Sequence, residues 1–380
     1  MAKKLRTGFE LPFSNQDIDQ TKTFSSDKNY LFSGIINGLE GVGNTTRDFN
    51  YLIPNPSDSV TIYQRTFART LVNGTRGCIW GGNGVMLSID VSTLNSGFFS
   101  NNWFYMGSGW LNSAHWHKLL MLTDGTDVYT IQINYNSGTP FIEVYQRGVG
   151  QISNTPISGY SNSTWYNVKC SIANNGDIEV DWNGTTISYS TGTTFATLTG
   201  VAIGHTSVNV HSASMDDLAI NDGSGSSDNG IPNSIRGYNF FDQATLDSQT
   251  GFSTVGGSTI LANLTDGDDA TRVSAEADLS EMNFSLPTLS GTGMSETASN
   301  FTKIEAINVY GRQIESTKAS SVLKAKITDA TSSANREEDI SLPLTVANDS
   351  AVMFDDGASD WSLANLDAGN IDLKITFDKP

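Results

Sequence analysis

The sequence has 380 residues, with 22 Lys or Arg against 40 Asp or Glu, and its formal net charge is −18. At this charge we expect no nucleic-acid partner, because an acidic protein repels phosphate backbones, and no apolar stretch is long enough to predict membrane insertion. The N-terminal basic residues are not followed by the apolar run of a secretory signal, so we expect the chain not to be exported by that route. The length suits two domains.

Apolar and polar residues alternate with a period of two along the chain, and no window of about 12 residues keeps a helical spacing. The pattern therefore predicts an all-β fold. In chain order, the clearest predicted strands cover 128–136, 141–146, 163–173, 199–205, 214–222, 301–311, 321–330 and 370–377. Short strands at regular spacing are typical of a β-sandwich.

The segment "DIEVDWNGTTISYS" (177–190) predicts a hairpin around Asn183-Gly184, because this dipeptide favours a two-residue turn with positive φ at both positions. Such a turn pairs Trp182 with Thr185 and places the apolar residues of both strands on one face. The opposite face should be polar, with Asp177, Glu179 and Asp181 facing Thr186, Ser188 and Ser190.

The run "GSGSSDNG" (223–230) has no apolar residue and indicates an exposed linker between domains. We therefore predict two β-sandwich, jelly-roll domains, over 1–222 and 231–380. In the second one, the strand "NIDLKITF" (370–377) should have one dry face and one wet face.

The first predicted domain resembles a known fold in its second half. "STWYNVKCSIANNGDIEVDWNGTTIS" followed by "VAIGHTSVNVHSASMDDLAIND" is similar to the end of a laminin-G-like, or concanavalin-A-like, jelly-roll domain. The shared features are a Trp-Tyr strand, the Asn-Gly hairpin, a Val-x-Ile-Gly strand and a closing Asp-Asp-Leu-x-Ile strand. The resemblance implies a lectin-like sandwich for residues 1–222.

The order of segments also resembles a group of tailed-bacteriophage virion proteins. The shared segments are Gly8-Phe9-Glu10, the Asp-Asp-Leu strand with its Gly/Ser connector, "LTDGDDATRV" (264–273), "IEAINVYGR" and "DWSLANLDAGNIDLKITF", while residues 10–60 match only loosely. The resemblance implies a structural virion protein, on the tail as an appendage or fibre or on the capsid as a decoration. It also implies assembly in the host cytoplasm, other virion proteins as partners and a homo-oligomeric state.

The acidic pair Glu179 and Asp181 raises the alternative of a glycan-cleaving enzyme. Retaining glycanases need two carboxyl groups about 5–5.5 Å apart, and the β-sandwich glycanases resemble a Glu-x-Asp-x-x-Glu pattern. Here the third acidic position is Gly184, in the predicted turn. We therefore expect a non-catalytic protein without a cofactor, and keep a bacterial lectin or adhesin as a further alternative.

The segment "FFSNNWFYMGSGWLNSAHWHK" (98–118) is the strongest candidate for ligand binding, because aromatic rings stack on sugars while amides and imidazoles orient hydroxyl groups. Burial or subunit contact is the competing role for each aromatic residue. His115 and His117 also have a spacing that suits a metal, but no third ligand follows, so we expect no metal site. The predicted ligand-binding residues are Trp103, Tyr105, Trp110, His115 and His117.

The clustered aspartates and the two cysteines have structural explanations. The aspartates at 266, 268 and 269 and at 355, 356 and 360 suit turns at least as well as calcium. Cys78 and Cys170 are expected to be small core residues, with one disulfide between them as the alternative.

Overall fold

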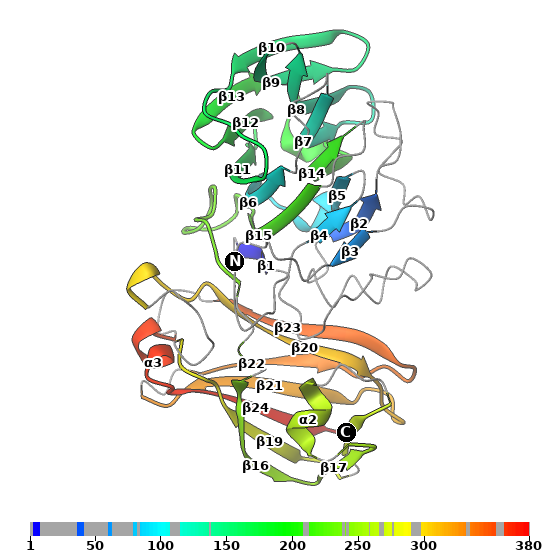
Figure 1. The fold of residues 1–380 in the computed structure, drawn as a ribbon. Helices are drawn as coiled ribbons and strands as arrows, with labels where there is room; N and C mark the ends of the chain where they lie inside the picture. The colour runs from blue at the N-terminus through cyan, green and yellow to red at the C-terminus, as the bar shows by residue number, and fades with distance from the viewer. Residues whose placement is uncertain are drawn as a thin grey trace.

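The computed structural model describes most of the chain. The described residues are 3–7, 36–41, 60–62, 79–81, 84–106, 115–136, 138–207, 213–237, 240, 243–257, 259–265, 270–275, 277–289, 298–331, 335–354 and 361–379. Within them the fold is all-β, as the alternation predicted, with strands joined by antiparallel pairing (Figure 1).

The first sandwich consists of two antiparallel sheets. One has eight strands in the order β13-β12-β11-β6-β15-β4-β3, with β1 also paired to β15. Its strands are β1 (Lys3–Thr7), β3 (Val60–Ile62), β4 (Ile79–Gly81), β6 (Phe98–Met106), β11 (Thr164–Ile172), β12 (Asp177–Trp182), β13 (Thr185–Ser190) and β15 (Ala213–Asn221).

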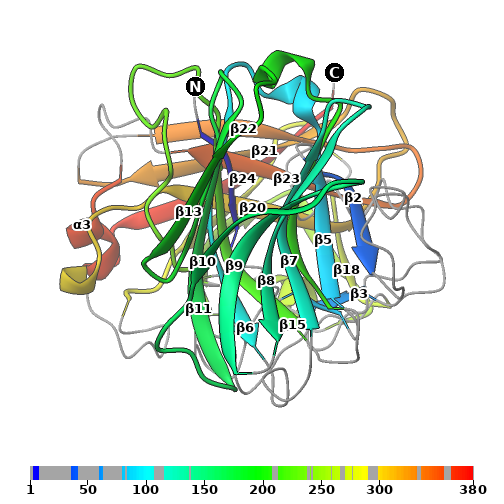
Figure 2. The same cartoon turned by 90° about the horizontal axis from the view of Figure 1, so that it is seen from above.

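The other sheet has seven strands in the order β10-β9-β8-β7-β14-β5-β2. These are β2 (Ile36–Gly41), β5 (Gly84–Ile89), β7 (His115–Thr123), β8 (Val128–Asn136), β9 (Thr139–Gln146), β10 (Gly150–Pro156) and β14 (Gly200–Ser207). Figure 2 shows the two sheets facing each other, with β6 and β11 in one layer and β8 and β9 in the other.

The core of the first sandwich comes from alternate residues of both sheets. Phe104 and Trp182 are each 1% exposed, and Ile131 and Val144 from the seven-stranded sheet belong to the same cluster. Each such side chain contributes about 1.5–3 kcal/mol through the surface it removes from water. Hydrophobic burial between the layers therefore fixes which face of every strand points outward.

The hairpin at Asn183-Gly184 forms as predicted. Asn183 has φ 48° and Gly184 has φ 93°, and β12 pairs with β13 in the register Trp182–Thr185, Val180–Ile187 and Ile178–Tyr189. Ile178, Val180 and Trp182 are buried, which puts the acidic residues of β12 on the outward face.

The second sandwich has a five-stranded sheet in the order β16-β19-β24-β21-β22 and a two-stranded sheet of β20 and β23. A further small pair joins β17 and β18, and two short helices, α2 and α3, lie beside the sheets. The strands and helices are β16 (Thr245–Thr250), β17 (Phe252–Val255), α2 (Ile260–Thr265), β18 (Arg272–Ala275), β19 (Ser280–Ser285), β20 (Ala306–Ile314), β21 (Val322–Asp329), β22 (Asn335–Ser341), β23 (Ala347–Phe354), α3 (Leu363–Asp367) and β24 (Ile371–Asp378).

Strand β24 confirms the predicted wet and dry faces. Ile371, Leu373, Ile375 and Phe377 are buried, and the residues between them are partly exposed. On the wet side Lys374 lies 2.5 Å from Glu281, at an exposure where an ion pair adds little stability.

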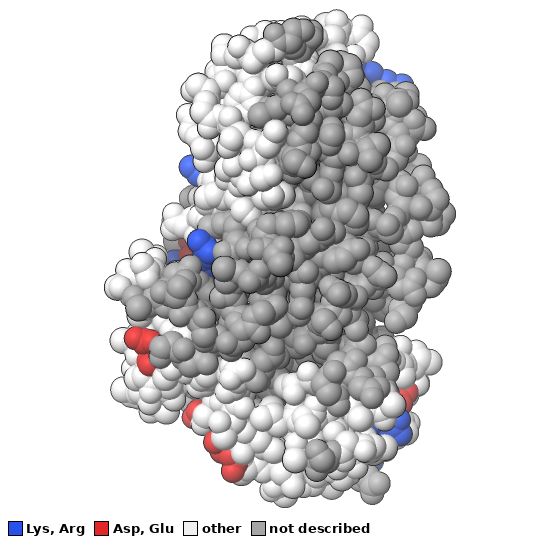
Figure 3. Space-filling view, in the orientation of Figure 1, with Lys and Arg blue, Asp and Glu red and all other residues white. Residues whose placement is uncertain are grey.

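Each sandwich has its own hydrophobic cluster, one formed by buried residues from Leu5 to Ile220 and one by buried residues from Ala244 to Ile375. Figure 2 shows strands of the second sandwich running across those of the first, and Figure 1 places β1 where the two meet. On the face seen in Figure 3, most of the visible acidic side chains lie on the second sandwich.

Candidate functional site

Trp103 and Tyr105 lie on the outward face of the eight-stranded sheet. Their neighbour Phe104 is in the core, so the alternation of β6 turns both aromatic side chains outward. Tyr105 packs against Trp165 of β11, with ring centroids 5.5 Å apart. The indole N–H of Trp103 donates to Ser234 Oγ at 2.8 Å, so a residue of the chain itself occupies this polar atom.

The segment from Gly230 to Gly237 is docked on the same face. Asn221 Nδ2 donates to the carbonyl of Gly230 at 2.9 Å, and Asn101 Nδ2 donates to the carbonyl of Pro232 at 2.9 Å. The backbone N–H of Gly237 donates to Asp217 Oδ1 at 3.0 Å. Residues 224–229 are mostly exposed, as expected of a connector, but the chain beyond them is held along β6 and β15.

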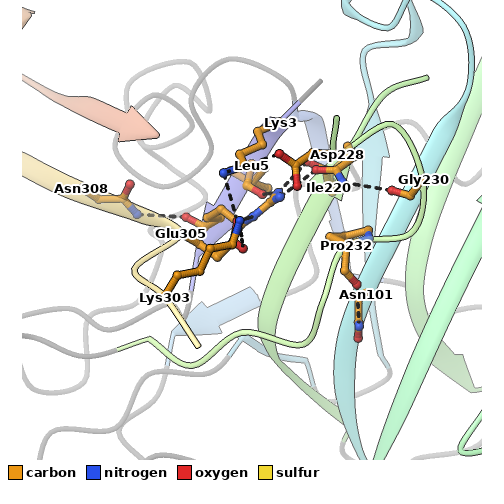
Figure 4. A network of polar contacts seen from close by, with 12 residues as sticks. Lys3, Leu5, Asn101, Ile220, Asp228, Gly230, Pro232, Lys303, Glu305 and Asn308 are labelled. Atoms are coloured by element: carbon orange, nitrogen blue, oxygen red, sulfur yellow. Dashed lines mark hydrogen bonds and ion pairs between the residues drawn. The ribbon is translucent and has the colours of Figure 1, made fainter. Parts of the chain in front are cut away.

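Arg6 of β1 contacts both sandwiches. Figure 4 shows Ile220 of the first sandwich near Glu305 and Asn308 of the second, and these three residues are among its partners. Its guanidinium donates to Asn221 Oδ1 at 2.7 Å and to the carbonyl of Ile220 at 2.9 Å, and it lies 3.4 Å from Glu305 of the second sandwich. Asn308 Nδ2 donates to the carbonyl of Arg6 at 2.9 Å. Arg6 is 4% exposed, which makes this a shielded contact rather than a surface ion pair.

The charges around Glu305 decide its ionisation. Burial acts to raise the pKa of Glu305, but the hydrogen bond from Lys303 and the charges of Arg6 and Lys3 outweigh it, so the pKa is lowered. Burial lowers the pKa of Arg6 in spite of the Glu305 charge, yet a guanidinium stays protonated at any ordinary pH. The contact is therefore an ion pair at neutral pH.

The side chain of His117 differs from expectation. His117 is 0% exposed and pairs in register with the core residue Ile133, whereas we expected an exposed imidazole. The cause is a bulge in β7 between Lys118 and Leu120, which reverses the alternation that Leu120 and Leu122 would impose on the start of the strand. His117 therefore belongs to the seven-stranded sheet, on the opposite layer from Trp103 and Tyr105.

The remaining predicted positions are only partly visible. His115 is the first residue of β7, and its side chain lies outside the described part. Trp110, Cys78, the Gly8-Phe9-Glu10 segment and both predicted aspartate clusters also lie outside the described residues. The ligand-binding role of the five predicted residues stays a prediction.

Asp177 and Asp181, two of the three acidic residues of β12, take part in turns. Asp181 Oδ1 accepts the N–H of Gly184 at 2.9 Å and its Oδ2 accepts the hydroxyl of Thr186 at 3.3 Å. Hydrogen bonds from Ser190 and Asn175 lower the pKa of Asp177. Glu179 is exposed, in register with Ser171 and Ser188 on its two neighbouring strands. This face is that of a solvated hairpin.

The seven-stranded sheet has a polar row on its outward face that sequence reasoning missed. Lys118, Gln132 and Glu143 are cross-strand neighbours on β7, β8 and β9 and are 7%, 0% and 1% exposed. They alternate with the core residues Ile131 and Val144, so they point away from the sandwich core. The sequence does have a polar residue at each outward position of "TIQIN" and "IEV", but any strand with one solvent-exposed face shows the same pattern.

Hydrogen bonds order this polar row. Gln132 Nε2 donates to Glu143 Oε1, and Asn134 Nδ2 donates to Glu143 Oε2 at 3.2 Å. Thr130, one alternation further along β8, is 1% exposed and is in register with Tyr145. The row is thus a shielded set of amide, carboxylate, hydroxyl and ammonium groups.

Cys170 is a buried free thiol of β11, which confirms its expected role in the core. Burial raises the pKa of its thiol to about 12, which keeps it unreactive. Among the described residues, His, Cys, Asp and Glu side chains do not gather in threes as a metal ion would need, and no helix there has the length and apolarity to cross a membrane.

These features define an all-β protein of two sandwiches, the first with a shielded polar row on one outward face. No family model and no curated protein matches the chain. Among solved structures it is similar to the cellulose-induced protein Cip1 (13% identity, TM-score 0.29, covering 43% of this chain and 84% of that one). It is also similar to the carbohydrate-binding module CBM66 from Bacillus subtilis (12%, 0.27, 38% and 86%) and to the alginate lyase vAL-1 from Chlorella virus (10%, 0.31, 55% and 98%). Likeness at these TM-scores carries no argument about activity.

Proposed function

We propose that this chain is a non-catalytic structural protein of a tailed-bacteriophage virion, present as a tail appendage or fibre or as a capsid decoration. Its first, lectin-like sandwich attaches to other virion subunits and binds surface glycans. The order of segments shared with such virion proteins, over nearly the whole chain, supports the proposal. An enzymatic role is not favoured, because Asp181 holds the hairpin turn at Gly184 and the third position of the glycanase pattern is that glycine.

The contact around Arg6 is the structural observation that best supports the proposal. A buried arginine of the first strand ties the first sandwich to Glu305 and Asn308 of the second, and the connector adds hydrogen bonds along the same face. Two sandwiches fixed in this way suit a part that must hold its shape on a particle. Because particle sites repeat by symmetry, we expect a homo-oligomer there.

The test is the location of the chain after lysis. Mass spectrometry of particles banded on a density gradient should detect the chain at a fixed ratio to the major capsid or tail proteins. A chain found in the cleared supernatant or on the bacterial surface, but absent from the banded particles, contradicts the virion role. Recovery from the bacterial surface would favour the alternative of a bacterial lectin or adhesin.

A further inference from the structure

The polar row brings an amine, a carboxamide and a carboxylate together on three adjacent strands. Lys118 of β7 is directly opposite Gln132 of β8, and Gln132 is directly opposite Glu143 of β9. Side chains that are directly opposite in an antiparallel pair have Cβ atoms about 4.5–5.5 Å apart. The long lysine side chain can therefore reach the carboxamide carbon of Gln132.

All three side chains are shielded from water. Lys118 is 7% exposed, Gln132 is 0% exposed and Glu143 is 1% exposed. An amine attacks a carbonyl carbon only when it is neutral, and keeping two opposite charges out of water is costly, so burial favours transfer of the amine proton to the carboxylate. Because both reactants belong to the chain, the site needs no opening through which a ligand could enter.

Hydrogen bonds hold the carboxylate at the group that would leave. Gln132 Nε2 donates to Glu143 Oε1, and Asn134 Nδ2 donates to Glu143 Oε2 at 3.2 Å. A carboxyl group in this position can pass a proton directly to the nitrogen of the carboxamide. The sheet also fixes the amine beside its target, which removes most of the entropy cost of bringing two reactants together.

We propose that Lys118 and Gln132 form an intramolecular isopeptide bond, with Glu143 as the proton carrier. Lys118 Nζ forms a bond to Gln132 Cδ, and the bond from Cδ to Nε2 breaks. The ammonium nitrogen gives up two of its three protons through Glu143, and the departing NH₂ group takes them up and leaves as ammonium. One cation replaces another, and the step consumes no oxidant, reductant or further reactant.

The bond would tie β7 to β8 covalently. It closes the chain from 118 to 132 into a loop, and a closed loop restricts the unfolded chain, which stabilises the fold. This modification goes beyond the proposed function, because it depends only on the chemistry inside the first sandwich. The virion role and the bond can therefore fail separately.

Lys169 on the other sheet provides a natural comparison. It is directly opposite Asn101 of β6 and Asp181 of β12, so it too has a carboxamide and a carboxylate beside it. Lys169 is only half-buried, and the carboxylate lies on the far side of the amine from the carboxamide. Asp181 also accepts the N–H of Gly184. We therefore expect no bond at Lys169.

The experiment measures the mass of the purified full chain and of its tryptic peptides. The intact chain should be lighter than its sequence by the mass of one ammonia molecule. Trypsin does not cut after a lysine whose amine is acylated, so residues 77–147 should remain one peptide instead of separating into 77–118 and 119–147. Fragmentation of that peptide should locate the bond between Lys118 and Gln132.

Three variants test the assigned roles. Lys118→Arg removes the reacting amine and Glu143→Gln removes the proton carrier, so both should keep their full sequence mass. Lys169→Arg is the matched control, because it makes the same change to a lysine opposite a carboxamide, and it should still lose ammonia. Circular dichroism shows whether each variant folds.

The wild-type masses decide the inference even where a variant does not fold. A wild-type chain at its full sequence mass, with separate 77–118 and 119–147 peptides, overturns it. An ammonia loss that maps to another position, such as a succinimide at an Asn-Gly pair, also overturns it. A Glu143→Gln chain that forms the bond as completely as the wild type overturns the role of Glu143.

Discussion

The two outward faces of the first sandwich carry similar polar residues but use them differently. On the eight-stranded sheet, Asn101, Asn221 and Trp103 donate to the connector, and Arg6 contacts the second sandwich. On the seven-stranded sheet, Gln132 keeps an acceptor without a donor. The connector covers the first face, where Ser214 Oγ still lacks a hydrogen-bond partner among the described residues, and on the second face Gln132 Oε1 and Thr130 Oγ1 lack one.

The type of residue on a face therefore does not show whether another segment of the chain docks there. Asn and aromatic residues are common to both, and what differs is that the connector, a segment of the chain itself, forms hydrogen bonds with only one of the two faces within the described residues. The connector supplies them to one sheet because it leaves β15 and runs back along β6. The three measurements below test the contacts that the eight-stranded sheet makes with the connector and with the second sandwich.

The largest effect is expected for Arg6→Ala. The change leaves Glu305 and Asn221 without their buried guanidinium, and we expect a loss of about 3 kcal/mol in the free energy of unfolding. Urea denaturation followed by circular dichroism measures it. The exposed Arg147 offers a matched control, because Arg147→Ala should change stability by less than about 0.5 kcal/mol. Equal effects of the two variants would show that the Arg6 contact does not hold the sandwiches together.

A smaller effect is expected where the connector meets Trp103. A double-mutant cycle with Trp103→Phe and Ser234→Ala isolates the bond from the indole N–H to the hydroxyl, and the coupling should be about 1 kcal/mol. Hydrogen exchange of residues 230–237 should become faster in each single variant. A coupling of zero would mean that the connector is held by the contacts of its backbone with Asn101, Asn221 and Asp217 and not by the Trp103 bond.

The smallest effect is a dependence on pH. The folded-state pKa of Glu305 lies below its ordinary value of 4.5, so the carboxylate stabilises the fold above that pH, and this stabilisation is lost as the pH falls through the lowered folded pKa. The protection of the β1 amides, relative to their intrinsic exchange rate at each pH, should therefore be high at neutral pH and fall in acid. Glu305→Gln should remove the acid-dependent part of the change in β1 exchange. If its acid response matched that of the wild type, another carboxylate would control the contact.

The sequence predicts regular elements well where one face is buried. Strand 128–136 forms as β8, and the final strand matches within one residue at each end, because the alternation of Leu373, Ile375 and their neighbours is uninterrupted. The hairpin register follows from Asn183-Gly184 alone. The helices α2 and α3 were not predicted, because five or six residues are too few to show a helical period.

By itself, the sequence determined the all-β class, the register of the β12–β13 hairpin and the outward position of Glu179, because each depends on local alternation or on one turn. Only the tertiary structure decided where His117, Lys118 and Trp103 point and what they meet. A bulge in β7 turned His117 inward and Lys118 outward, and Ser234, which lies 131 residues further along the chain, accepts the indole N–H of Trp103. Both outcomes depend on strand pairing and on contacts distant in sequence, which no local pattern records.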